Sequence, residues 1–344
     1  MRNPLLKSAR MRAFLPAVIS AVVILGFGFY ETSPAGLALG VNIALAAISA
    51  VGLTLIIGGA GQLSLGQAGF MAIGAYGTAD LMANRGVAFV PAVILSVLAA
   101  LIVGNLVGYI ALRLQGNYLA MATLALGAGI FALLLIPGFL GGANGFAGIP
   151  PPEILGVKFL KPRDQYLLAA VVLVVVLFAV QALLSSRAGR EFAAMRDDEV
   201  AAKAIGINIT SRKVQVFAVA SAIGGLSGAL NGPIQSAIDP YLFSPAVSLQ
   251  IFVIVILGGL GNIYGAVFGS AFLIWLITVI PGNGSWALAI LGVVVVVFMA
   301  VLPDGLPGVL RLIVSGIRRV RNGPTSDSAG GAGEDTASPL EARA

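Results

Sequence analysis

The chain has neither cysteine nor histidine among its 344 residues. Without cysteine it can form no disulfide and offers no thiolate nucleophile. Without histidine it lacks the side chain that proteins use most often as a general base or metal ligand. We therefore expect no catalytic residue, no metal site and no cofactor, and an enzyme is the class that the sequence favours least.

Charged residues are scarce as well, at 10% of the chain against 58% hydrophobic residues. A soluble domain carries about 25% charged residues, because its surface must face water. Several apolar runs here approach or exceed the roughly 20 residues that a helix needs to cross a bilayer. They lie at 13–30, 37–57, 87–112, 165–184 and 285–302. The sequence predicts an all-α, polytopic bundle of transmembrane helices.

Glycine, proline and charge divide the chain into ten apolar segments, of which some are short or glycine-rich. We therefore expect about 8–10 spans, with re-entrant pieces as an alternative to full spans. The ten segments are 13–30, 37–57, 66–83, 88–112, 118–136, 165–184, 213–231, 246–260, 263–280 and 285–302.

Lysine and arginine cluster in three places beside these segments: residues 1–12, the loop 185–213 and residues 311–321. Short loops rich in these residues stay in the cytoplasm, so both termini are predicted to be cytoplasmic. Lys158, Lys161 and Arg163 would then lie outside, against the rule. The domain plan is a tail at 1–12, a membrane domain at 13–310 that contains the loop 185–213, and a basic, then disordered tail at 311–344.

The chain has no G-x-x-x-x-G-K-[ST] phosphate loop, so it does not hydrolyse ATP by that route. Acidic and basic residues are also missing from the centres of the predicted spans, where ion-coupled transporters usually place them. Uphill transport would therefore need energy from a partner. A secondary transporter or channel that needs no partner remains the alternative.

The loop 185–213 contains a predicted two-turn helix. Asp198 and Glu199 suit the start of a helix, Glu199 and Lys203 are spaced as an i,i+4 ion pair, and Gly206 suits the left-handed position after its end. Such a helix would present small side chains and one isoleucine outside the membrane. It would either dock into a groove of another protein or be an ordinary solvated helix between two spans. The exposed residues would be Ala201, Ala202, Ala204 and Ile205.

Four stretches carry a family resemblance. EVAAKAIG at 199–206 resembles the E-A-A…G signature of ABC importer permeases, and MRDDEVAAKAIGIN at 195–208 resembles the cytoplasmic loop of the LivM-type permeases of branched-chain amino-acid importers. GQLSLGQAGFMAIGAY at 61–76, GGANGFAGIP at 141–150 and LGGLGNIYG at 257–265 are similar to further motifs of that family. The resemblance runs from about residue 37 to 310 with the motifs in the family's order, and Asn262 and Ala266 depart from its usual Thr or Ser and Pro.

The resemblance implies a multi-pass permease subunit in the cell inner (plasma) membrane that translocates branched-chain or related amino acids. Its implied partners are a second homologous permease subunit, two ATP-binding subunits and a periplasmic or extracellular solute-binding protein that docks at 141–152, with no nucleic acid. An ABC permease for urea or short amides is the nearest alternative. The implied ATPase-coupling residues are Arg196, Asp198, Glu199, Ala201, Ala202, Lys203 and Gly206.

The turns at 58–63 and 258–263 share the pattern G-G-x-G-[QN]-[LI]. Interrupted helices often line transport sites, because freed backbone groups can face a cavity. We expect two corresponding broken helices beside the substrate path, lined by Gln62, Ser64, Gln67 and Asn262. Close packing of helices through small residues is the alternative explanation.

Overall fold

The structure is a computed structural model that describes residues 4–111, 114, 116–279 and 292–293 of the chain. The predicted tail at 311–344 and nearly all of the predicted segment at 285–302 lie outside the described residues.

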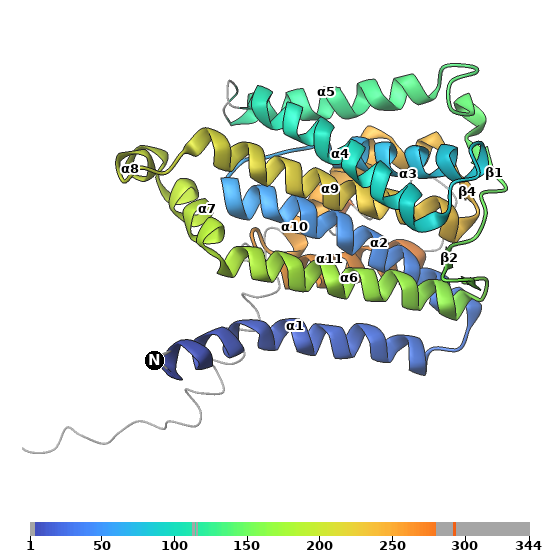
Figure 1. Cartoon of the computed structure of the whole chain (residues 1–344), viewed down its shortest axis with the longest axis horizontal. Helices are drawn as coiled ribbons and strands as arrows, with labels where there is room; N and C mark the ends of the chain where they lie inside the picture. Colours follow the sequence, from blue (N-terminus) through green and yellow to red (C-terminus); the bar gives the residue numbers. More distant parts are fainter. Residues whose placement is uncertain (1–3, 112–113, 115, 280–291, 294–344) are drawn as a thin grey trace, which may run out of the picture.

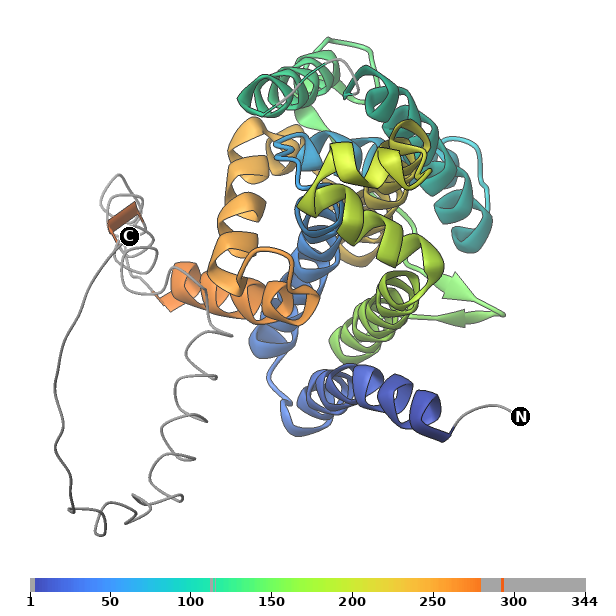
Figure 2. The same cartoon turned by 90° about the vertical axis from the view of Figure 1, so that its left-hand side faces the viewer.

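The described chain is almost wholly helical, and most of its nine long helices run roughly along one direction, whereas α10 and α11 lie across it (Figure 1 and Figure 2). Two short helices, α7 and α8, sit beyond one end of the bundle. The helices are α1 (Pro4–Tyr30), α2 (Pro34–Leu55) with its π-helical continuation η1 (Ile56–Ala60), α3 (Gln67–Ala83), α4 (Phe89–Ala111), α5 (Asn117–Leu134), α6 (Pro162–Ser185), α7 (Arg187–Asp197), α8 (Glu199–Ala204), α9 (Ile209–Gln235), α10 (Pro245–Gly258) and α11 (Ile263–Val279), with 3₁₀ turns η2 (Gly142–Asn144) and η3 (Pro240–Phe243).

The predicted helical membrane bundle is confirmed. Within the described residues, five helices are long and apolar enough to cross a bilayer: Pro34–Ala60, Phe89–Ile110, Asn117–Leu134, Pro162–Ser185 and Ile209–Gln235. The pair α10 and α11, bent by 117°, makes a sixth if it counts as one span. The count is below ten because this pair is bent, α3 has 17 residues, the apolar part of α1 is only Pro16–Tyr30, and the segment 285–302 lies almost wholly outside the described residues.

Helix starts follow local chemistry. Ser33 caps α2 by accepting a hydrogen bond from the Gly36 amide at 3.1 Å, and Pro34 follows as the first helical residue. Asn208 caps α9 in the same way through the Ser211 amide at 3.0 Å. These caps satisfy backbone groups that would otherwise lack partners at the helix ends.

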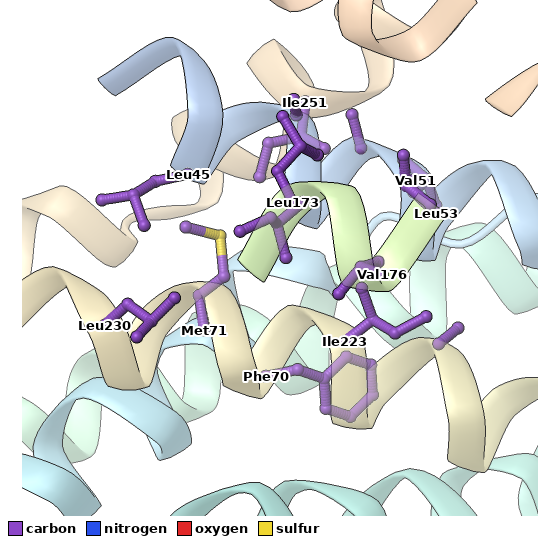
Figure 3. Close-up of a cluster of buried hydrophobic side chains, with 14 of the residues drawn as sticks. Leu45, Val51, Leu53, Phe70, Met71, Leu173, Val176, Ile223, Leu230 and Ile251 are labelled. Atoms are coloured by element: carbon purple, nitrogen blue, oxygen red, sulfur yellow. The ribbon is translucent and has the colours of Figure 1, made fainter. Parts of the chain in front are cut away.

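Helix α2 forms the centre of the bundle, with 83% of its apolar window buried, whereas 28% is buried in α5 at the edge. Figure 2 shows α1 beside α6 at one edge and α4 and α5 at the other. Side chains from several helices meet around α2, including Met71 of α3, Leu173 of α6 and Ile223 of α9 (Figure 3).

Glycine brings α3 and α9 into backbone contact. A Cβ atom added to Gly74 would lie 1.9 Å from the Gly225 carbonyl oxygen, and one added to Gly228 would lie 1.9 Å from the Met71 carbonyl oxygen. No side chain fits at either position without moving a helix. Because lipid gives helices little hydrophobic reason to associate, such close packing contributes much of their association energy.

The end of the bundle opposite α7 and α8 carries the only strands among the described residues, two pairs of two residues each. β1 (Phe146–Ala147) pairs with β4 (Ala237–Ile238), and β2 (Glu153–Ile154) pairs with β3 (Val157–Lys158). Apart from these pairs, the all-α prediction is correct. Two of the basic residues that would lie outside under the predicted orientation have partners here: Lys158 lies 3.9 Å from Glu153, and the Arg163 guanidinium lies 4.9 Å from the centre of the Phe29 ring.

Replacing Gly74 by valine should separate α3 from α9 and lower the stability of the bundle by about 1–3 kcal/mol, the usual cost of overpacking. The matched control is Gly129→Val in α5, because an added Cβ there meets no atom within 4 Å. Thermal unfolding in detergent would measure both variants. Equal melting temperatures for the two would contradict the close contact.

Candidate coupling loop and translocation path

Helix α7 is an amphipathic helix that lies against the π-helical turn η1. Ser186 caps it by accepting a hydrogen bond from the Gly189 amide at 3.4 Å, and Phe192 and Met195 are buried on one face. This helix was not among the elements predicted from the sequence. The spacing of Ala188, Phe192 and Met195 by four and three residues is the signal that could have found it.

Helix α8 matches its prediction closely. The Asp198 carboxylate accepts hydrogen bonds from the Val200 and Ala201 amides at 2.7 and 3.0 Å. Gly206 has φ of 85°, its amide donates to the Lys203 carbonyl, and the Ile207 amide donates to the Ala202 carbonyl. This pair of hydrogen bonds is the Schellman motif, which ends a helix at a left-handed residue.

Helix α8 differs from the prediction in the exposure of Val200 and Ala202 and in the ion-pair partner of Glu199. Val200 and Ile205 are 80% and 75% exposed, and Val200 lines a groove of about 670 Å³ beside α8 and the start of α9. Ala202 is only 2% exposed, so it packs inward instead of joining the presented surface. Glu199 pairs with Lys213 of α9 at 2.5 Å and not with Lys203, because Lys213 lies almost buried beneath it.

Glu191 joins α7 to α9. Its carboxylate accepts a hydrogen bond from Arg187 Nε at 2.9 Å and pairs with Arg212 of α9. The Arg187 hydrogen bond, and then Arg212, lower the pKa of Glu191 from its ordinary value of 4.5. Together with Glu199 and Lys213, this cluster fixes the loop to α9 by two ionic contacts.

The two G-G-x-G turns break their helices as predicted. The first turn follows α2 through η1 and ends at Gly61, which has φ of 64°. The second separates α10 from α11, where the chain bends by 117°. Asn262 caps α11, because its side-chain oxygen accepts hydrogen bonds from the Tyr264 and Gly265 amides at 3.0 and 3.2 Å. Thr and Ser, the usual family residues at this position, also cap helices. Asn262 therefore replaces them without loss of the capping role.

The first and second turns touch each other, since a Cβ atom on Gly58 would lie 2.7 Å from the Gly261 Cα atom. The predicted alternative of close packing through small residues therefore holds at the same turns that break the helices. Arg196, predicted as a residue that faces an ATPase, reaches this contact and donates from Nη1 to the Gly58 carbonyl at 3.2 Å.

The predicted path residues occupy the stretch between η1 and α3. Ser64 and Gln67 are fully buried, and Gln67 Nε2 donates to the Ser49 carbonyl at 3.1 Å. Gly52 of α2 and Gly224 of α9 leave room for this amide, because a Cβ atom at either would lie within 3.0 Å of Gln67 Nε2. Within the described part of the chain, Gln62 Oε1, Ser64 Oγ and Gln67 Oε1 are buried acceptors without a hydrogen-bond partner.

Among the described residues, no group of three or more acidic, cysteine or histidine side chains could hold a metal ion. The site offers a set of buried acceptors between η1 and the start of α3, and an exposed apolar helix at one end of the bundle.

Replacing Glu191 by glutamine should lower the melting temperature of the protein at neutral pH, since it removes the carboxylate shared by Arg187 and Arg212. Because the folded-state pKa is depressed, this stabilisation is present above the unfolded-state pKa and disappears as pH falls through the folded-state pKa. Melting curves of both proteins from neutral to acidic pH should converge at the acid end. A difference that stays constant with pH would contradict the ionic role.

The comparisons with known proteins agree on one family. The profile of the family described as "Branched-chain amino acid transport system / permease component" matches residues 36–302. The chain is similar to the high-affinity branched-chain amino acid transport system permease protein LivM of Salmonella typhimurium, at 32% identity over 75% of this chain and 67% of the relative. LivM of Escherichia coli is 31% identical over the same shares.

Over a shorter stretch, the chain is also similar to the high-affinity branched-chain amino acid transport system permease protein LivH of Salmonella typhimurium, at 32% identity over 30% of this chain and 35% of that protein. No solved structure gives a significant match.

Proposed function

Because the chain belongs to the family of branched-chain amino acid transport permeases, we propose that it moves a branched-chain amino acid inward and that ATPases drive it through α8. As a permease it is a multi-pass membrane protein and not an enzyme. The family implies ATPase and solute-binding partners. The specific contacts and substrate below are part of the proposal.

One observation carries the coupling site: a chain with no phosphate loop exposes two large apolar side chains on a short helix outside the membrane-length helices. Val200 and Ile205 would insert into an ATPase, and the adjacent groove would receive part of it. The exposed Ala201, Lys203 and Gly206 would lie around them. Buried Ala202, the cap Asp198 and the paired Glu199 would support the helix from behind.

The buried acceptors support an amino acid as substrate. An ammonium group has three hydrogen-bond donors, and Gln62, Ser64 and Gln67 offer three unpartnered oxygens in the described structure. Asn262 would contribute to the path indirectly, because its side chain caps the start of α11 at the second turn. Urea also donates through N–H groups, so the same acceptors leave a urea or short-amide permease as the second candidate.

Transport would follow alternating access. When the ATPases close, the ionic contacts of Glu199 and Glu191 pass the displacement of α8 and α7 to α9, which packs on α2, α3 and α4. The match to LivH supports a second, homologous permease subunit as the other half of the pathway. The loop at 141–152, held to the bundle by the pairing of β1 with β4, is the proposed contact for a solute-binding protein.

Replacing Val200 by aspartate should reduce co-purification of the ATPase subunits by about tenfold or more, because an unpaired carboxylate resists burial in an interface. Val157→Asp is the matched control, since Val157 is 62% exposed at the opposite end of the bundle. Quantitative mass spectrometry after purification in mild detergent measures both. If Val200→Asp keeps its ATPases and nucleotide-dependent uptake, α8 is not the coupling site. Uptake by vesicles without any ATPase would support a self-sufficient secondary transporter.

Replacing Gln67 or Gln62 by leucine should raise the KM for leucine uptake by about tenfold, the effect of one lost hydrogen bond to a charged group. Gln215→Leu is the control, because Gln215 is exposed at the α7 end of α9. Uptake of radiolabelled leucine and urea by vesicles that contain the whole transporter decides the substrate class. Unchanged kinetics at normal assembly levels would remove these residues from the path.

A further inference from the structure

The two glycine turns meet backbone to backbone at Gly58 and Gly261. A Cβ atom on Gly58 would lie 2.7 Å from Gly261 Cα, and one on Gly261 would lie 3.4 Å from Gly58 Cα. The turns belong to helices 200 positions apart in the sequence, and both lie at the end of the bundle that carries α7 and α8. Their contact therefore joins the end of η1, which continues α2, to the α10–α11 pair at that end.

Arg196 of α7 lies on this contact. Its guanidinium is held at one edge by Asp197, at 3.3 Å from Nε and 3.1 Å from Nη2, and donates from Nη1 to the Gly58 carbonyl at 3.2 Å. A Cβ atom on Gly261 would lie 4.0 Å from the same Nη1 atom. The Gly58 carbonyl belongs to the last turn of η1, where carbonyl groups lack helical donors ahead of them.

We propose that the contact between Gly58 and Gly261 is the inner gate of the path, and that Arg196 is the positioning residue through which the coupling loop moves it. The inference rests on the proposed function, because it takes α8 as the element that the ATPases displace. Arg196 stands two residues before Asp198, the cap of α8, so a displacement of α8 reaches the guanidinium with almost no intervening chain.

The loop has separate contacts to two parts of the bundle. Glu199 and Glu191 tie it to α9, whereas Arg196 ties it to the end of η1. Movement of the loop therefore carries the Gly58 carbonyl with it and draws the first turn away from the second. The connection is a hydrogen bond from a charged donor, which is stronger than a neutral one. Only backbone atoms meet at the gate, so a small shift separates them.

Replacing Arg196 by glutamine in the whole transporter tests the connection. ATPase subunits should still co-purify and hydrolyse ATP, whereas leucine uptake in the same vesicles should fall by about tenfold, as expected for the loss of one charge-assisted hydrogen bond. Arg196→Lys should recover part of the uptake, because its ammonium group still donates. Arg190→Gln, an exposed arginine of the same helix that bonds only to the end of α6 among the described residues, should transport as the natural protein does.

Two results would overturn the proposal while leaving the proposed function intact. Normal uptake by Arg196→Gln would show that the hydrogen bond transmits nothing. Loss of the ATPase subunits from Arg196→Gln would make Arg196 a docking residue. Failure of the proposed function appears elsewhere, as retention of the ATPases and of nucleotide-dependent uptake in Val200→Asp.

Gly58→Ala tests the gate without touching Arg196. Its methyl group would press on Gly261 Cα at 2.7 Å and hold the turns apart, whereas the methyl group of Gly59→Ala would meet Val216 and Phe192 at ordinary distances of 3.7 and 3.8 Å. With both variants purified at equal yield, Gly58→Ala should lose leucine uptake but keep ATP hydrolysis, and Gly59→Ala should keep both. Equal uptake by the two variants would overturn the gate.

Discussion

Direct contact between helix backbones is the constraint on which this protein depends. Moving an apolar side chain from the lipid acyl chains into a helix interface lowers the free energy little. Helices in a membrane therefore associate where their surfaces fit closely. Gly74 against Gly225, and Gly258 against Gly265, bring main-chain atoms together without intervening side chains. The close pairing of α3 with α9 and the tight bend between α10 and α11 follow from these contacts.

The parts of the fold that sequence predicted well are those set by local chemistry. Long apolar runs gave the membrane helices, and Asp198 and Gly206 gave both ends of α8, because a cap and a left-handed glycine act on their own neighbours. The shared G-G-x-G pattern located two helix breaks for the same reason. The assignment to a permease family came from motifs in these same local elements.

The sequence could not supply the tertiary partners. Glu199 had two lysines within reach, and the i,i+4 rule favoured Lys203, whereas the fold buries Lys213 beneath the carboxylate. Ala202 was assigned to the exposed face of α8 but packs inward, and no sequence pattern indicated that the exposed Arg196 donates to the Gly58 carbonyl. Each error concerns which way a side chain points once helices are assembled, and that depends on residues distant in the sequence.

The angle between α10 and α11 bears on how the chain is threaded through the membrane. A bend of 117° exceeds a right angle, so α11 heads back toward the face from which α10 started. Two stretches that hydropathy alone would draw as separate crossings therefore form either one broken span or a re-entrant loop.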